Sequence, residues 1–322
     1  MKLVFFGTPE FAAAHLEALV LEGHEILAVV TAPDKASGRG LKTSVSEVKT
    51  MAEKLHLRVL QPPSLKEPSF VEGLQNLNAE AFIVVAFRML PEVVWRIPVW
   101  GTYNIHASLL PKLRGAAPIQ WALINGATHT GVTMFKISHE IDTGVVLLQN
   151  ALAISAHWNA GHLHEQLKAL GCELLIKGIR LMQTFQDPKQ LPYFEQNASE
   201  ATQAPKLFKN DFILKWSDTC QNLLNKIRGL SPYPGAITFF INSQHQRRQL
   251  KIIHAQAAIN QPDFKRPPGH MMPFQHSLLV ATGNGWIEVL DLQPEGKRCM
   301  SAQDFCNGYA TELPYQLHEV LE

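Results

Sequence analysis

The chain has 322 residues, a hydrophobic fraction of 46% and nearly balanced charges, with 29 basic and 28 acidic side chains. This composition excludes a disordered chain, which would be poorer in apolar residues, and the length predicts about two domains. A net charge of +1 neither indicates nor excludes a nucleic-acid partner, because local patches matter more than the total. No apolar run approaches the roughly 20 residues of a membrane span, and the N-terminus lacks the features of a signal peptide, so we expect a cytoplasmic protein with no membrane partner.

Apolar runs and helical spacing alternate through the first half of the chain. The runs that predict strands are 2–6, 26–31, 58–62, 82–87, 102–108, 131–137 and 145–149. Helices are expected over about 9–22 with Thr8 as N-cap, from near Ser44 or Ser46, over 66–76 and over 160–184. This alternation predicts an α/β fold with a doubly wound, Rossmann-like and mainly parallel sheet, whose ligands bind at the carboxyl ends of the strands.

The composition changes after residue 185. Residues 189–208 are rich in proline and polar side chains and show little periodicity, which predicts a linker. A helix is expected near 217–229, followed by short strands at 237–241, 250–256, 277–283 and 286–292. Short strands separated by Gly and Pro turns predict a small β-barrel or sandwich. The expected domains are therefore 1–188 and 209–322.

The four cysteines are Cys172, Cys220, Cys299 and Cys306, and none of them forms a CxxC pair. Cys299 and Cys306 have no histidine nearby at the spacing of metal ligands. We therefore expect neither a disulfide framework nor a zinc site.

The turn after the first strand, GTPEF at 7–11, has one glycine where a dinucleotide-binding fingerprint has three. NAD binding is therefore not expected. Two interpretations stay open: a tight strand-to-helix turn, or a loop that lines a substrate cleft.

Polar side chains near one strand end could carry chemistry. Asn104 and His106 lie two apart on an expected strand and so face the same side of it. A carboxamide beside an imidazole can stabilise an oxyanion and transfer a proton, although such a pair is also common in a purely structural role. Asp142, in HEIDTG, could orient a histidine or belong to an ordinary turn. Arg114 could bind an anion or brace its loop.

One segment carries a resemblance to a known family. The sequence NIHASLLPKLRGAAPIQ at 104–120, with DTG at 142–144, resembles the 10-formyltetrahydrofolate-dependent formyltransferases. The resemblance covers nearly the whole chain. PDKASGRG at 33–40, RGAAPIQ at 114–120 and LQPEGKRCMSAQDF at 292–305 resemble the members that act on tRNA.

The resemblance implies roles for named residues. The family's catalytic trio corresponds to Asn104, His106 and Asp142, with Asp142 holding His106 in position. The segments expected to contact folate are Ser108, Leu109, Leu110 and Pro111, and Phe87, Arg88, Met89 and Leu90, where Phe87 and Arg88 replace a Tyr-Gly pair common in the family. The residues expected to contact tRNA are Lys35, Arg39, Lys42 and Lys206. The second domain is implied to be an OB-like barrel that also contacts tRNA.

The implied reaction is transfer of the formyl group of 10-formyltetrahydrofolate to the α-amine of methionine on initiator tRNA, releasing tetrahydrofolate. No metal is expected, and we expect a monomer. Three alternatives stay open: a sugar-nucleotide N-formyltransferase, a hydrolase that discards the formyl group, and a non-catalytic module that binds tRNA or folate. The intact trio argues against the last.

Overall fold

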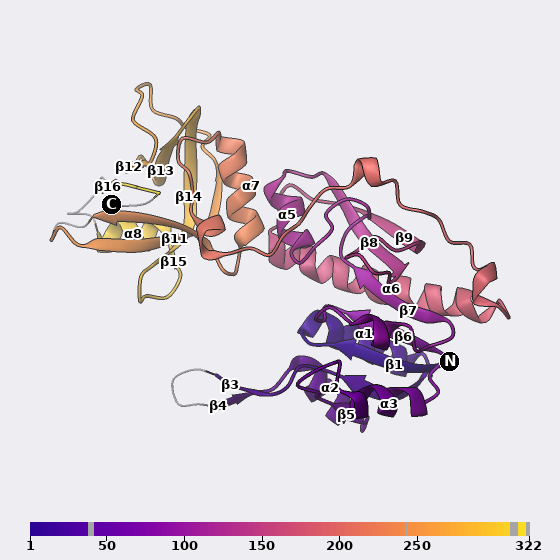
Figure 1. Cartoon of the computed structure of the whole chain (residues 1–322). Coiled ribbons are helices and arrows are strands. Elements are labelled where there is room, and N and C mark those ends of the chain that lie inside the picture. The colour runs from indigo at the N-terminus through magenta and orange to yellow at the C-terminus, as the bar shows by residue number, and fades with distance from the viewer. Residues whose placement is uncertain (38–41, 242–243, 310–314, 320–322) are drawn as a thin grey trace. The chain divides into compact units, whose positions relative to one another are not determined.

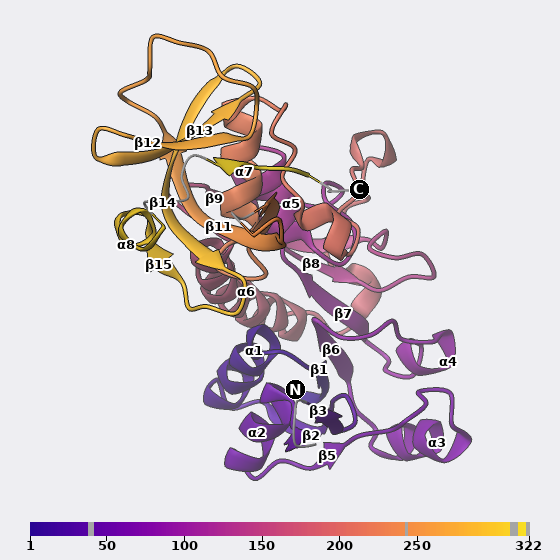
Figure 2. The ribbon, with the colours of Figure 1, turned by 90° about the vertical axis from the view of Figure 1, so that its left-hand side faces the viewer.

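The computed structural model describes residues 1–37, 42–241, 244–309 and 315–319, and it divides into two compact units. Unit 1 comprises Met1–Gly115, His129–Ala153 and His164–Ala204. Unit 2 comprises Ala116–Thr128, Ile154–Leu163 and the residues from Pro205 on (Figures 1 and 2). Two short segments that precede residue 164 therefore belong to the unit that is built mainly from the residues after Ala204.

Unit 1 is built on a seven-stranded sheet of order β5-β2-β1-β6-β7-β8-β9. Its strands are β1 (Lys2–Gly7), β2 (Glu25–Val30), β5 (Val59–Leu60), β6 (Ala81–Val85), β7 (Gly101–His106), β8 (His129–Lys136) and β9 (Val146–Ala153). The pairings from β5 to β7 are parallel, whereas β8 is antiparallel to both β7 and β9. The chain runs outward from β1 to β5 and then returns to β6 on the other side of β1. The predicted doubly wound and mainly parallel sheet is confirmed.

Helices cover both faces of this sheet. They are α1 (Glu10–Leu21), α2 (Glu47–Lys54), α3 (Pro68–Asn76), α4 (Glu92–Trp95) and α6 (Ala160–Gln183). Val4 and Val84 pack on one face with Leu74 of α3 and Val94 of α4. On the opposite face α6 lies close to the strands, because a Cβ at Gly178 would stand 2.1 Å from the sulfur of Met134 on β8.

Of two helix starts, the first departs in detail from the sequence prediction and the second agrees with it. The N-cap of α1 is Pro9 rather than Thr8, and the helix begins at Glu10. Ser46, one of the two candidates, caps α2 by accepting a hydrogen bond from the amide of Lys49 at 3.1 Å. A two-stranded hairpin precedes α2, with β3 (Lys35–Ser37) antiparallel to β4 (Lys42–Ser44). The sequence did not predict this hairpin, because its strands are short and mostly polar and show no apolar alternation.

Unit 2 contains an antiparallel sheet of order β10-β11-β14-β13-β12-β16. Its elements are α5 (Pro118–Ile124), α7 (Cys220–Leu230), β10 (Ala236–Ile241), β11 (Arg247–Ala257), β12 (His270–Phe274), β13 (Ser277–Thr282), β14 (Gly285–Pro294), β15 (Met300–Ser301), α8 (Ala302–Gly308) and β16 (Tyr315–Gln316). A bridge between Phe239 of β10 and His318, just after β16, brings the two ends of the sheet together. The predicted OB-like barrel is confirmed as a nearly closed barrel.

The barrel core is apolar and extends to its helices. Leu223 and Ile227 of α7, Ile252 of β11, Ile287 of β14 and Phe305 of α8 all lie in one buried cluster. Strand β12 was not predicted, because Pro273 interrupts it and its side chains alternate weakly.

The segment between α6 and α7 has little regular structure. Short 3-10 helices occupy Pro188–Gln190, Ala198–Glu200 and Lys209–Phe212. Among the helices formed by the described residues, none combines the length and apolar character needed to cross a membrane.

Candidate active site

Asn104 and His106 lie at the carboxyl end of β7, the central strand nearest the antiparallel pair. Asn104 stands opposite Val84 of β6 and Phe135 of β8, and His106 stands opposite Thr133. Ile105 points to the other face, where a Cβ at Gly171 of α6 would contact it at 3.4 Å. The shared face predicted from the spacing of the two polar residues is therefore present.

His106 is held by the loop that follows its own strand. Its side chain is only 8% exposed, and its Nε2 lies 2.9 Å from the carbonyl oxygen of Leu113. Because a carbonyl can only accept, Nε2 carries a proton. The other ring nitrogen, Nδ1, lies 3.8 Å from Oδ2 of Asp142. At that distance the two groups face each other without a direct hydrogen bond.

Asp142 brings a carboxylate to this loop from the connection between β8 and β9. Its side chain is 10% exposed, and its Oδ2 accepts a hydrogen bond from the amide of Gly115 at 2.8 Å. The backbone of Asp142 has a φ of 56°, a left-handed conformation that Asp adopts more readily than most residues. Leu113 and Gly115, two residues apart, thus contact the histidine and the aspartate, so one short loop fixes both.

Asn104 differs from these two groups, because its carboxamide has no hydrogen-bond partner within the described ranges. The side chain is partly exposed, so solvent can reach it. A donor that is already placed beside His106 and is not engaged elsewhere can bind a developing negative charge.

The segment that follows β7 is fixed by hydrogen bonds. The Ser108 hydroxyl donates to the carbonyl of Lys112 at 2.6 Å, and the Thr133 hydroxyl donates to the carbonyl of Ser108 at 2.7 Å. The amide of Leu110 donates to Thr133 at 3.1 Å, and Gln149 donates to the Leu110 carbonyl at 2.7 Å. These bonds tie the loop to β8 and β9.

Within this segment the four predicted folate-contacting side chains are not equivalent. Ser108 is fully buried, and Leu110 is 4% exposed in a small cluster with Phe135. Leu109 and Pro111 are only partly buried. Ser108 and Leu110 therefore shape the loop, and the accessible surface belongs to Leu109 and Pro111.

The segment after β6 lies beside the end of β7, since β6 and β7 are parallel neighbours. Phe87 packs edge-on against Phe6 at 5.8 Å, and Leu90 is buried in the core. The Arg88 guanidinium donates to the carbonyl of Pro62 at 2.6 Å, and Met89 is 70% exposed. Arg88, which replaces a glycine common in the resembled family, thus holds its loop to the connection that precedes α3.

The residues expected to contact tRNA are distributed over both units. Lys35 and Lys42 lie on β3 and β4, the hairpin of unit 1. Arg39 lies outside the described residues. Lys206, in unit 2, is exposed, and its Nζ stands 5.8 Å from the centre of the Phe208 ring.

Among the described residues, Glu10, His164 and Glu165 of unit 1 lie close enough together to be considered as metal ligands. The ammonium group of Lys168 stands between the two carboxylates, 2.6 Å from Glu10 and 2.7 Å from Glu165. A cation supplied by the chain itself therefore already compensates the negative charge.

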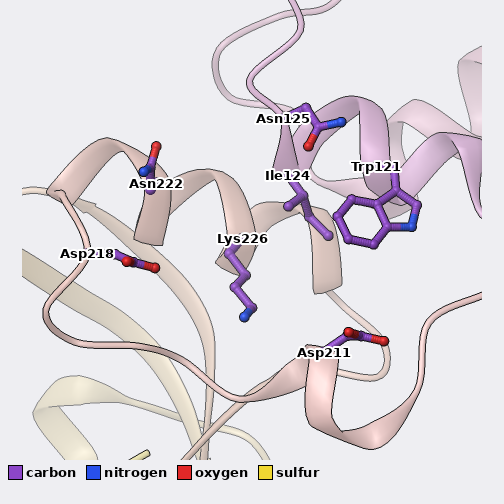
Figure 3. A pocket seen from close by; sticks show the side chains of 7 residues that line it. All are labelled: Trp121, Ile124, Asn125, Asp211, Asp218, Asn222 and Lys226. Carbon is purple, nitrogen blue, oxygen red and sulfur yellow. The ribbon is translucent and has the colours of Figure 1, made fainter. Parts of the chain in front are cut away.

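A cavity of about 400 Å³ lies in unit 2, between α5, α7 and the 3-10 helix at Lys209–Phe212 (Figure 3). Asp211, Asp218 and Lys226 line it together with Trp121. The Lys226 ammonium donates to the carbonyl of Ile213 at 2.7 Å, and burial lowers the pKa of this lysine. The cavity contains none of the residues that carry the predicted chemistry.

Sequence reasoning missed a set of residues that the structure brings to the site. The chain between Gln196 and Ala204, expected to be linker, runs beside the loop at 113–115. The amide of Leu113 donates to the Thr202 hydroxyl at 2.9 Å, and the carbonyl of Arg114 accepts from the amide of Ala204 at 2.7 Å. Polar residues in an aperiodic stretch gave no signal of this contact.

Comparison with known proteins defines the class. A family model described as formyl transferase matches residues 1–179, and the model of the formyl transferase C-terminal domain matches 206–310. The class is therefore that of two-domain formyl transferases.

Relatives that carry a name narrow the assignment within this class. The methionyl-tRNA formyltransferase of Parabacteroides distasonis is 42% identical over 98% of each chain, and that of Flavobacterium johnsoniae is 39% identical over 96% of each. The chain belongs to the methionyl-tRNA formyltransferase family.

Solved structures of lower identity share the fold. A sugar 3N-formyl transferase, WlaRD, has a TM-score of 0.63 at 17% identity, covering 92% of this chain and 99% of that one. HypX from Aquifex aeolicus, solved in complex with tetrahydrofolic acid, has a TM-score of 0.64 at 15% identity, and the chain spans 47% of its length.

Proposed function

We propose that the chain transfers the formyl group of 10-formyltetrahydrofolate to the α-amine of methionine on initiator tRNA, with Asn104, His106 and Asp142 as its catalytic residues. The observation that carries this proposal is the convergence of His106 and Asp142 on the loop at 113–115, with Asn104 on the same strand face as His106, in a chain 42% identical to a methionyl-tRNA formyltransferase. The named relatives support the choice of acceptor.

Asn104 would stabilise the tetrahedral intermediate. When the amine adds to the formyl carbon, negative charge develops on the former carbonyl oxygen. The unengaged carboxamide N–H of Asn104 can donate to that oxygen. A single donor of this kind is worth about 3 kcal/mol in other acyl-transfer sites.

His106 and Asp142 would accept and transfer the proton that the attacking amine loses. The imidazole lies on the same strand face as Asn104, two residues away. Asp142 stands behind it, fixed by the Gly115 amide at 2.8 Å, and keeps a carboxylate within 3.8 Å of Nδ1. Closing of that gap by a small shift or a bridging water would join the two groups in a relay from the amine to N10 of the leaving folate.

The folate would bind along the carboxyl edge of β6 and β7. Leu109 and Pro111 on one side and Phe87, Arg88 and Met89 on the other offer accessible surface to a pterin. Ser108 and Leu110, being buried, would support this surface from beneath. The formyl carbon is activated by its aryl nitrogen, so the proposed chemistry draws on no metal.

The tRNA would be bound by basic groups on both units: Lys35 and Lys42 on the hairpin, Arg39 between them in the sequence, and Lys206 at the start of the second unit. The OB-like barrel within 209–322 would add further phosphate contacts, as such barrels commonly bind nucleic acids. We propose that the enzyme acts as a monomer, which light scattering would test.

The deciding experiment measures formyl transfer from 10-formyltetrahydrofolate to methionyl-tRNA, comparing initiator with elongator tRNA. Asn104→Ala and Asp142→Ala are assayed beside the wild type. We expect formylation of the initiator only, lost in both variants. Release of formate without formylated product would instead indicate a hydrolase. Formylation of an amino-sugar nucleotide with none of methionyl-tRNA would indicate a sugar-nucleotide enzyme.

A further inference from the structure

We propose that Gln196 is a positioning residue for this reaction: its carboxamide links the turn that carries Asp142 to the loop that holds His106. The inference rests on the proposed roles of His106 and Asp142. Gln196 touches no reacting atom, and its effect passes through those two side chains.

The carboxamide of Gln196 uses both of its ends. Its Nε2 donates to the carbonyl of Asp142 at 2.9 Å and to the carbonyl of Gly144 at 2.8 Å. Its Oε1 accepts from the guanidinium of Arg114, at 2.7 Å from one terminal nitrogen and 3.2 Å from Nε. One neutral side chain thus spans two segments that are far apart in sequence.

The turn that Gln196 holds has little freedom of its own. Asp142 has a left-handed φ of 56°, and a Cβ at Gly144 would stand 1.7 Å from the carbonyl of Lys136. A turn in this conformation persists only where its surroundings fix it. The two hydrogen bonds from Nε2 hold the carbonyl groups of Asp142 and Gly144, on either side of Thr143, and so fix the direction in which the Asp142 side chain leaves the backbone.

The loop at 113–115, which Gln196 contacts through Arg114, is also held by Thr202 of the same segment as Gln196. The Arg114 amide donates to the carbonyl of Thr202 at 2.9 Å, and the Leu113 amide donates to the Thr202 hydroxyl at 2.9 Å. Leu113 in turn accepts from His106, and Gly115 donates to Asp142. Loss of the Gln196 link would let the Asp142 turn move relative to this loop and change the 3.8 Å separation between Nδ1 and Oδ2.

The sequence left open whether Arg114 binds an anion or braces its loop. Arg114 braces its loop through Gln196, and its partner there is a neutral amide. Because Gln196 both accepts from Arg114 and donates to the Asp142 turn, a carboxylate in its place could keep the first contact but not the second.

The test compares Gln196→Met, which removes both contacts, with Gln196→Glu, which keeps only the contact to Arg114. Gln203→Met is the matched control, because Gln203 is an exposed glutamine of the same segment. We expect both Gln196 variants to lower kcat by about tenfold to a hundredfold, as misplacement of a catalytic group does. KM for folate and tRNA and the melting temperature stay within the range of the Gln203→Met control.

A double-mutant cycle separates positioning from a general structural effect. Single-turnover rates are measured for Gln196→Glu, Asp142→Asn and the double variant. If Gln196 acts through Asp142, its substitution costs little further rate once the carboxylate is gone. The proposal is overturned if Gln196→Glu lowers the single-turnover rate by the same factor in the wild type and in Asp142→Asn. A normal kcat in Gln196→Glu would also overturn it. Failure of the proposed function would be seen separately, as a wild type that forms no formylated methionyl-tRNA.

Discussion

The Nζ of Lys49 lies 2.5 Å from Oδ2 of Asp34, joining helix α2 to the residue that precedes the β3–β4 hairpin. The pairing holds the pKa of the Asp34 carboxyl below its usual range, with the hydrogen bond from Lys49 as the largest cause. Gln61 donates to the other carboxylate oxygen at 2.7 Å and to the carbonyl of Ala32 at 2.8 Å. The base of the hairpin is therefore tied to both α2 and the end of β5.

Loss of the contacts at the base of the hairpin is expected to weaken the binding of tRNA more than the binding of folate. Asp34→Asn removes the charge that Lys49 pairs with, so the hairpin that carries Lys35 and Lys42 loses its fixed direction. We expect KM for tRNA to rise several-fold, with kcat, KM for folate and the melting temperature little changed. Lys54→Met, which breaks a second exposed ion pair of α2 with Glu17, is the control. An unchanged KM for tRNA would count against a role for the hairpin in binding.

Asn104→Ala is expected to lower kcat by about a hundredfold to a thousandfold, because one donor to the developing oxyanion is lost. KM for folate is expected to change little, since the donor gains its strength in the transition state. Steady-state rates at saturating substrates test this. A rise in KM with an unchanged kcat would instead make Asn104 a binding residue.

Acidification is expected to destabilise the protein partly through His15. Burial lowers the pKa of His15 from 6.5 to about 4, since its ring is enclosed and Nε2 has no partner among the described residues. In the unfolded chain His15 takes up a proton below about pH 6.5, whereas in the folded chain it does so only near pH 4. The free energy of unfolding is therefore not reduced by His15 above about pH 6.5, and it falls as the pH is lowered toward 4. The expected loss at about pH 5 is about 2 kcal/mol.

The measurement is urea unfolding of the wild type and of His15→Gln at neutral pH and near pH 5. The variant cannot titrate at this position, so its stability should depend less on pH than that of the wild type. Other groups are common to both proteins and cancel in the difference. Equal pH dependence in the two proteins would show that His15 does not contribute.

Two glycine substitutions are expected to act in opposite directions. Gly144→Ala places a Cβ 1.7 Å from a carbonyl oxygen of β8, so the turn carrying Asp142 has to move, and both stability and kcat should fall. Gly73→Ala, within α3, meets nothing within 4 Å and should raise stability by about 0.5–1 kcal/mol. Thermal unfolding and kcat measure both effects. An active, stable Gly144→Ala would contradict the close packing of this turn.

Lys206→Ala is expected to weaken tRNA binding and to reduce its salt dependence. Each phosphate contact contributes about 0.7–0.9 to the slope of log K against log salt concentration, so removal of one contact lowers the slope by that amount. Binding is measured at several salt concentrations, with Lys54→Ala as control. A uniform loss of affinity with the wild-type slope would mean that Lys206 contacts no phosphate.

The sequence predicted those parts of the fold and site that depend on local pattern. The apolar runs of β1 and β6 specify strands buried on both faces, and the two-residue spacing of Asn104 and His106 specifies a shared face. The strands of the hairpin β3–β4 are short and mostly polar, and so no apolar pattern revealed them. The short helix α8 and strand β16 are likewise stabilised by the barrel around them rather than by their own periodicity.

Contacts between segments distant in sequence could not be predicted from local pattern. Asp142 entered as a partner of His106 through family resemblance, because a DTG turn by itself fits many loops. Gln196 carried no motif and lies in a stretch with no periodicity. Its place beside Arg114 follows from the path of the chain after α6, which is set by packing of distant segments.

The interleaving of the two units constrains the order in which a ribosome-bound chain can complete them. Helix α5, with Ile119, Ala122 and Leu123 buried in unit 2, leaves the ribosome long before α7, which packs against it, has been made. Its apolar face is therefore uncovered during much of synthesis. The nascent chain passes through a stage with the parallel sheet complete and an exposed apolar helix, when chaperone capture or misassociation with another nascent chain competes most strongly with folding.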